Sequence, residues 1–96
     1  MNSIKSFNPK TDIELNELLE KLLVSEIDFN IIINIGDLNL IFFKEIQKLL
    51  NLSKKNKKSL IIVSSKLSDE KLNIVPTLSE AYDIIELEEI ERDLLS

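Results

Sequence analysis

The chain has 96 residues, of which 44% are hydrophobic and 30% charged, and its formal net charge is −5. This length supports one hydrophobic core, so we predict a single domain over residues 1–96. The acidic balance disfavours a nucleic-acid partner, because such a surface needs an excess of basic charge. Neither cysteine nor histidine is present, which removes the usual thiol nucleophile, general base and zinc ligands. We therefore predict no catalytic activity, metal or cofactor.

The distribution of apolar residues carries no membrane or export signal. No apolar run approaches the roughly 18 residues of a membrane span, and the first residues lack the apolar core of a signal peptide. The absence of cysteine fits a reducing compartment. We expect a cytoplasmic protein that binds neither membrane nor nucleic acid.

The first elements are a short strand and an amphipathic helix. Residues 3–7 are compatible with a strand at a sheet edge, and Asn8 and Pro9 with a turn. Thr11 and Glu14 form a capping-box pattern at a helix start. The residues that follow recur at i, i+3, i+4, i+7 and i+8, which predicts a one-sided apolar helix: Leu15, Leu18, Leu19, Leu22 and Leu23.

Two short, continuous aliphatic runs predict strands that are buried on both faces. They span residues 29–35 and 59–65, and such runs are typical of parallel or mixed sheets. Residues 73–75 are predicted to form a third, shorter strand before Pro76. Because helices alternate with these strands, the sequence predicts an α/β fold with a central mixed or parallel sheet of about four strands.

A second helix is predicted from about Leu40 to Lys55, and the chain's only glycine, Gly36, precedes it. The side chains predicted to face the core are Phe42, Ile46, Leu49 and Leu50. We interpret Asp37 and Asn39 as caps of this helix. A lysine cluster ends the helix (Lys54, Lys55, Lys57 and Lys58), where cations complement the negative end of the helix dipole; binding of an anionic partner is the sharper alternative.

The C-terminal helix carries two apolar stripes. Thr77 and Glu80 form another capping box after Pro76. At about 100° per residue, a first stripe of core character comprises Leu78, Ala81, Tyr82 and Ile85. A second stripe lies roughly opposite and comprises Leu87, Ile90 and Leu94. One straight helix cannot bury both against one sheet, so it either breaks near Glu86 or presents residues 86–96 as a protruding docking end.

Site chemistry is weak elsewhere. Asp37 lies at the carboxyl end of a central strand, where open α/β sheets place ligands, so a degenerate receiver-like domain that binds phosphate or Mg²⁺ is our alternative function. The acidic pair and the lysine expected of a receiver are missing. Ser64 and Ser65 lack a glycine-rich phosphate cradle, and the acids of the C-terminal helix do not match a calcium-binding loop.

The order of elements, from residues 30–35 through residues 59–64 to the capped C-terminal helix, resembles a STAS domain, the fold of bacterial anti-sigma-factor antagonists. Residues 75–94 are similar to the C-terminus of small STAS-like proteins of Bacteroidota-type bacteria. The resemblance implies a regulatory domain that binds protein. The family's opening hairpin is reduced to residues 3–7, and residues 40–46 lack its phosphorylatable serine, so the resemblance does not carry over the phospho-switch.

The sequence therefore predicts a non-catalytic, regulatory protein-binding domain. The predicted partner-binding residues are Asp37, Asn39, Phe43 and Lys44 at the start of the second helix, together with Leu87, Ile90 and Leu94 of the second stripe. For the second stripe three roles stay open, namely packing in its own core, formation of a homodimer and binding of a different protein. The sequence identifies neither the partner nor the pathway.

Overall fold

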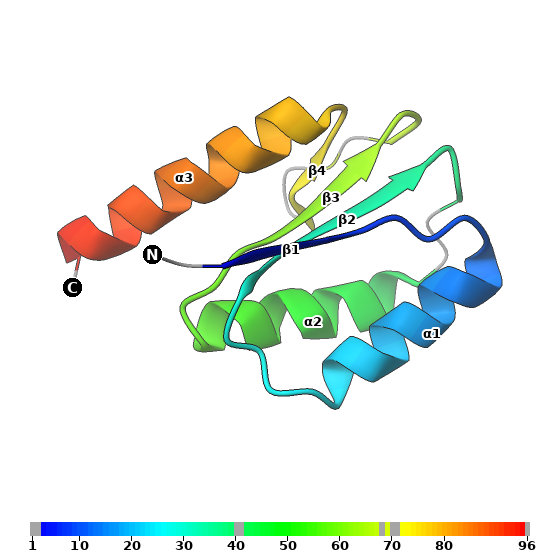
Figure 1. Cartoon of the computed structure of the whole chain (residues 1–96), viewed down its shortest axis with the longest axis horizontal. Coiled ribbons are helices and arrows are strands. Elements are labelled where there is room, and N and C mark those ends of the chain that lie inside the picture. Colours follow the sequence, from blue (N-terminus) through cyan, green and yellow to red (C-terminus); the bar gives the residue numbers. More distant parts are fainter. Residues whose placement is uncertain (1–2, 40–41, 68, 70–71, 96) are drawn as a thin grey trace.

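The structure, a computed structural model, describes residues 3–39, 42–67, 69 and 72–95 (Figure 1). These residues form an α/β fold with one four-stranded sheet in the order β1-β2-β3-β4, and every adjacent pair of strands is parallel. The predicted fold class is confirmed. The elements in chain order are β1 (Ile4–Phe7), α1 (Asp12–Leu23), β2 (Asn30–Gly36), α2 (Phe43–Lys55), β3 (Leu60–Ser64), β4 (Ile74–Val75) and α3 (Leu78–Leu95).

The helices divide unequally between the two faces of the sheet. Figure 1 shows α1 and α2 side by side on one face and α3 alone on the other. We call these the two-helix face and the one-helix face. Parallel strands need connections that cross the sheet, and α1 and α2 provide them between β1, β2 and β3.

The two-helix face holds the larger core. Side chains alternate across a strand, so Ile31, Ile33 and Ile35 of β2 point to this face beside Leu60 and Ile62 of β3. They pack against buried leucines and isoleucines of the two helices, namely Leu15, Leu19, Leu22, Ile46, Leu49 and Leu50. The predicted apolar side of the first helix is confirmed, with Leu18 and Leu23 partly buried at its margin.

Local hydrogen bonds at α1 follow the predicted cap with one difference. The Oγ1 atom of Thr11 accepts a hydrogen bond from the backbone N–H of Glu14 at 3.1 Å. The Glu14 carboxylate accepts from the backbone N–H of Lys10 at 2.7 Å and not from that of Thr11. The cap therefore includes the residue before Thr11, which fixes the turn that leaves β1.

The start of α2 differs from the predicted one. The helix begins at Phe43, the cap residue is Phe42, and no side chain caps it; Leu40 lies outside the described residues. Asp37 and Asn39 are exposed in the loop after β2, so their interpretation as caps is wrong. The physical reason is distance along the chain, because a capping side chain reaches amides only two or three residues ahead. Ile46, Leu49 and Leu50 are buried as predicted.

The one-helix face has a small core. It consists of Ile32 of β2, Ile61 and Val63 of β3, and Ala81 and Ile85 of α3, with Val75 and Ile84 at its margin. Leu78 and Tyr82, predicted to be core residues, are 41% and 46% exposed. A helix that rests alone on a sheet buries only the strip directly beneath it, and these two side chains lie beside that strip.

Among the described residues, no helix combines the length and the apolar character that crossing a membrane would require.

Candidate docking surface

Helix α3 is continuous, and its last buried residue is Ile85. It does not break near Glu86. Ten further residues follow, and the second stripe lies on the side away from the sheet, with Leu87 58%, Ile90 50% and Leu94 80% exposed. In the folded chain these aliphatic side chains are surface, so the interpretation that they pack in their own core is wrong.

Geometry explains why α3 outruns its own core. Its 18 residues span roughly 27 Å at 1.5 Å per residue, whereas the five residues of β3 span about 17 Å. Figure 1 shows α3 running back along the sheet and extending past the starts of the strands. The helix is therefore longer than the apolar sheet surface beneath it, and its last residues extend beyond that surface.

A polar cluster, which we call the polar clamp, holds the second half of α3. The buried Ser59, just before β3, donates its hydroxyl to Glu88 Oε1 at 2.6 Å. Arg92 Nη1 donates to the Ser59 hydroxyl oxygen at 3.1 Å and lies 3.9 Å from Glu88 Oε1. The backbone N–H of Ser59 donates to Asn30 Oδ1 at 2.8 Å. Glu88 and Arg92 therefore face inward, and the second stripe faces outward.

The polar clamp is incompletely satisfied. Asn30 Nδ2 and Arg92 Nη2 are buried and have no hydrogen-bond partner among the described residues. Unsatisfied buried donors reduce stability, so these two donors offset part of what the hydrogen bonds of the polar clamp contribute.

The lysines that end α2 lie close to this region. Lys54, Lys57 and Lys58 line a hollow of about 260 Å³ together with Glu88, Glu91 and Arg92. Carboxylates of α3 therefore share the hollow with the lysines, which favours a role for these cations within the fold.

The other predicted partner-binding residues lie elsewhere. Asp37, Asn39, Phe43 and Lys44 are all exposed, and Phe43 is 50% exposed at the first position of α2. They lie at the carboxyl ends of the strands and on the two-helix side. The second stripe lies above the amino ends, on the one-helix side (Figure 1). The fold does not bring the two predicted sets together into one surface.

The loop after β2 is stabilised by its own hydrogen bonds. Gly36 adopts a φ of +58°, and its N–H donates to Asn34 Oδ1 at 3.1 Å. The Ser65 hydroxyl donates to the Gly36 carbonyl oxygen at 3.0 Å. The Ser64 hydroxyl oxygen accepts from the N–H groups of Lys66 and Leu67 at 3.2 and 3.1 Å. Both serine hydroxyls thus have intramolecular partners, which disfavours a phosphate site here.

No group of three acidic, histidine or cysteine side chains suited to a metal ion occurs in the described part of the chain. Within the described residues, Asp37 is therefore not part of a group of three side chains that could bind Mg²⁺.

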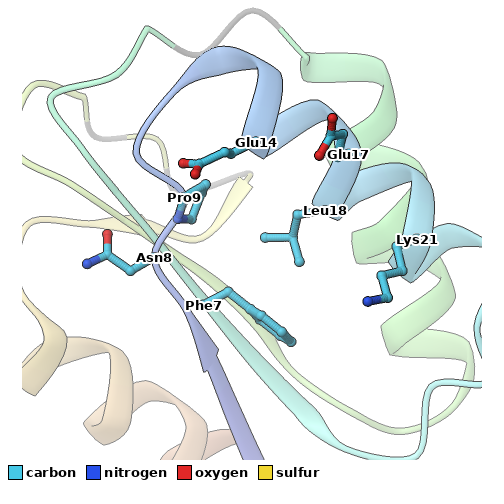
Figure 2. Close-up of a pocket in the computed structure, with 7 residues that line it drawn as sticks. All are labelled: Phe7, Asn8, Pro9, Glu14, Glu17, Leu18 and Lys21. Atoms are coloured by element: carbon cyan, nitrogen blue, oxygen red, sulfur yellow. The ribbon is translucent and has the colours of Figure 1, made fainter.

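A groove that the sequence did not predict runs between β1 and α1. It comprises two adjoining hollows of about 350 and 590 Å³, which share Phe7, Leu18 and Lys21. Figure 2 shows Phe7 and Leu18 pointing into the space between strand and helix, with Glu14 and Glu17 on α1 above them. The groove is lined mainly by β1 and α1, two elements that follow each other in the chain.

This groove borders an open strand edge, because β1 is the first strand in the sheet order. Exposed edges can pair with an added strand, and charged side chains on them oppose such pairing. The ammonium group of Lys5 lies 4.2 Å from the centre of the Phe29 ring at one end of the groove. Lys5 therefore adds a positive charge to this edge strand.

Sequence reasoning also missed the polar clamp. Asn30 and Ser59 are polar residues at the starts of two aliphatic runs, and both are buried. A buried polar residue needs a partner, so their position was a usable signal, although nothing local indicated Glu88 and Arg92 as the partners.

Comparison of this chain with protein-family models, with curated proteins and with solved structures gives no match.

Proposed function

We propose that this chain is a non-catalytic, regulatory domain that binds another protein through the second stripe of α3. The observation that supports it is the placement of Leu87, Ile90 and Leu94 on the outside of a helix whose own core contacts end at Ile85. A helix face that only meets water is normally polar. Burying each such side chain in an interface would contribute about 1.5–3 kcal/mol.

The polar clamp supports this role. Because Glu88 and Arg92 bond to Ser59, the helix cannot easily rotate and bury the second stripe against the sheet. A surface held in its binding orientation loses less entropy when a partner docks.

The resemblance to STAS domains belongs to the same proposal. It supports a regulatory, protein-binding role in the cytoplasm, without phosphorylation of a serine at the start of α2. The second set of residues, comprising Asp37, Asn39, Phe43 and Lys44, would then serve a separate contact, since it lies far from the second stripe.

Site-specific photo-crosslinking tests the docking site. A benzoylphenylalanine is introduced at Ile90 in cells that produce the chain, and a matched variant carries it at Glu20, an exposed position of α1. We expect a discrete crosslinked species from Ile90 that is lost when Leu87→Asp is added, and none from Glu20. Adducts of equal yield from both positions, or none from Ile90, would contradict the proposed site.

The substitution Leu87→Asp or Ile90→Asp is expected to leave the domain folded while abolishing association. Circular dichroism and thermal unfolding of the purified variants check the first part. Loss of the cooperative fold in both variants would show that the second stripe stabilises the domain itself.

A further inference from the structure

The second stripe is bordered by carboxylates. Helix α3 contains seven acidic residues and one basic residue, Arg92. Arg92 turns inward to Ser59, so it does not neutralise the outer side of the helix. By helical spacing, Asp83 and Glu86 lie beside the stripe on one side and Glu91 on the other, and all three are exposed. Glu91 also lines the hollow of Lys54, Lys57 and Lys58. The docking surface is therefore an aliphatic strip with an acidic border.

A hollow of about 380 Å³ at the start of the stripe combines both characters. It is lined by Asp83, Glu86, Leu87 and Ile90. Within the described residues, neither Asp83 nor Glu86 forms a salt bridge. The aliphatic stem of a lysine or arginine can lie along Leu87 and Ile90 while its charged head meets the two carboxylates. The hollow thus matches a long basic side chain better than a purely apolar one.

The same border opposes a second copy of this chain. If two second stripes packed against each other, Asp83 and Glu86 of both copies would lie at one interface, and within the described residues neither has a salt-bridge partner. Like charges brought together across an interface suppress association. The net charge of −5 adds to this repulsion at longer range.

We propose, on the basis of the docking function above, that the partner segment is a basic amphipathic helix. Its apolar seam packs on Leu87, Ile90 and Leu94, and its lysine or arginine side chains flank the seam and pair with Asp83 and Glu86. The stripe spans eight residues from Leu87 to Leu94, which is a rise of about 10.5 Å along the helix axis. Two turns of the partner helix therefore suffice to cover it, with apolar residues at positions i, i+3 or i+4, and i+7.

Two labelled synthetic peptides test the chemistry. Both have the same leucine seam on an alanine-rich helix; one carries lysine and the other glutamate at the flanking positions. We expect the 96-residue chain to bind the lysine peptide at least tenfold more tightly in a fluorescence anisotropy titration. That affinity should fall as salt is raised, because exposed charges are screened.

Variants of the chain locate the binding. Ile90→Asp should weaken the lysine peptide at least tenfold. The double variant Asp83→Lys with Glu86→Lys should favour the glutamate peptide. A matched double variant on α1, Glu17→Lys with Glu20→Lys, makes the same change in net charge on another surface and should leave the preference unchanged. If the α1 variant reversed the preference equally well, the effect would be one of overall charge, and the inference would be wrong.

The outcomes separate this inference from the docking function. Equal binding of both peptides, abolished by Ile90→Asp, would leave the docking site and overturn the basic partner. If neither peptide bound while crosslinking from Ile90 persisted, the docking site would also stand and the basic partner would be overturned. A dimer in light scattering that Ile90→Asp dissolves would identify a second copy as the partner and overturn the inference. Failure of crosslinking from Ile90 would remove the docking function itself.

Discussion

The two faces of the sheet use similar sequences in different ways. On the two-helix face, the apolar stripe of α1 and the apolar residues of α2 meet the sheet directly, and Leu15, Leu19, Ile46 and Leu49 are completely buried. On the one-helix face, the apolar residues of α3 divide at Ile85. Those before it contact the sheet in part, and those of the second stripe contact none of it. The difference shows that an apolar stripe on a helix predicts that the stripe is buried. Whether it is buried inside the domain or by a partner depends on which elements lie beside the helix.

The largest expected effect is the loss of stability when a core residue of the two-helix face is truncated. Leu49→Ala on the two-helix face removes a completely buried side chain and should lower the free energy of unfolding by about 2–5 kcal/mol. Equilibrium unfolding in urea measures it. Gln47→Ala, on the exposed side of the same helix, is the matched control and should change stability by less than about 0.5 kcal/mol. Similar losses in both variants would show that α2 is not packed as described.

A smaller effect tests the polar clamp on the one-helix face. Ser59→Ala removes the hydroxyl that bonds to Glu88 and Arg92 and should cost about 1.5–3 kcal/mol, the range for hydrogen bonds to charged groups. Hydrogen exchange should quicken in the second half of α3, residues 86–95, and change little before Ile85. Ser65→Ala removes a single exposed hydroxyl from the other end of β3 and serves as the control. Uniform acceleration along α3 would count against a local clamp.

The smallest expected effect comes from replacing Gly36, which belongs to neither core. Gly36 has a φ of +58°, and a Cβ atom built there meets nothing within 4 Å. Gly36→Ala should therefore destabilise the domain by about 1 kcal/mol through backbone conformation alone. Gly36→Asn should cost less, because asparagine tolerates this conformation better than alanine. Equal costs would mean that the loop after β2 adjusts its backbone when the glycine is replaced.

The sequence predicted much of this architecture because local pattern and tertiary environment agree. The aliphatic side chains of β2 and β3 point to both faces of the sheet, so both faces must be covered by helices. The helical spacing from Leu15 to Leu23 places these leucines on one side of a helix, which packs against one face of the sheet. The parallel arrangement followed from the helices that connect the strands. The strands and α1 agree with the structure to within about two residues at their ends, whereas α2 begins three residues after its predicted start.

The sequence did not predict the features that depend on which elements pack together in the folded chain. Tyr82 has helical spacing with Ala81 and Ile85, yet it is exposed because no second helix lies beside α3. The start of α2 depends on backbone geometry after Gly36 that no capping residue marks. The groove beside β1 and the polar clamp each join residues about ten to sixty positions apart, such as Phe7 with Leu18 and Asn30 with Glu88, and no local pattern records such contacts.

The measurement that most directly tests the division of α3 is a comparison of Ile85→Ala with Ile90→Ala by equilibrium unfolding. The two residues have the same side chain on the same helix, and they are 1% and 50% exposed. We expect Ile85→Ala to cost about 2–5 kcal/mol and Ile90→Ala to cost less than about 1 kcal/mol. Equal and large losses would contradict the assignment of the second stripe to a docking surface, because Ile90 would then stabilise the fold in the same way as Ile85.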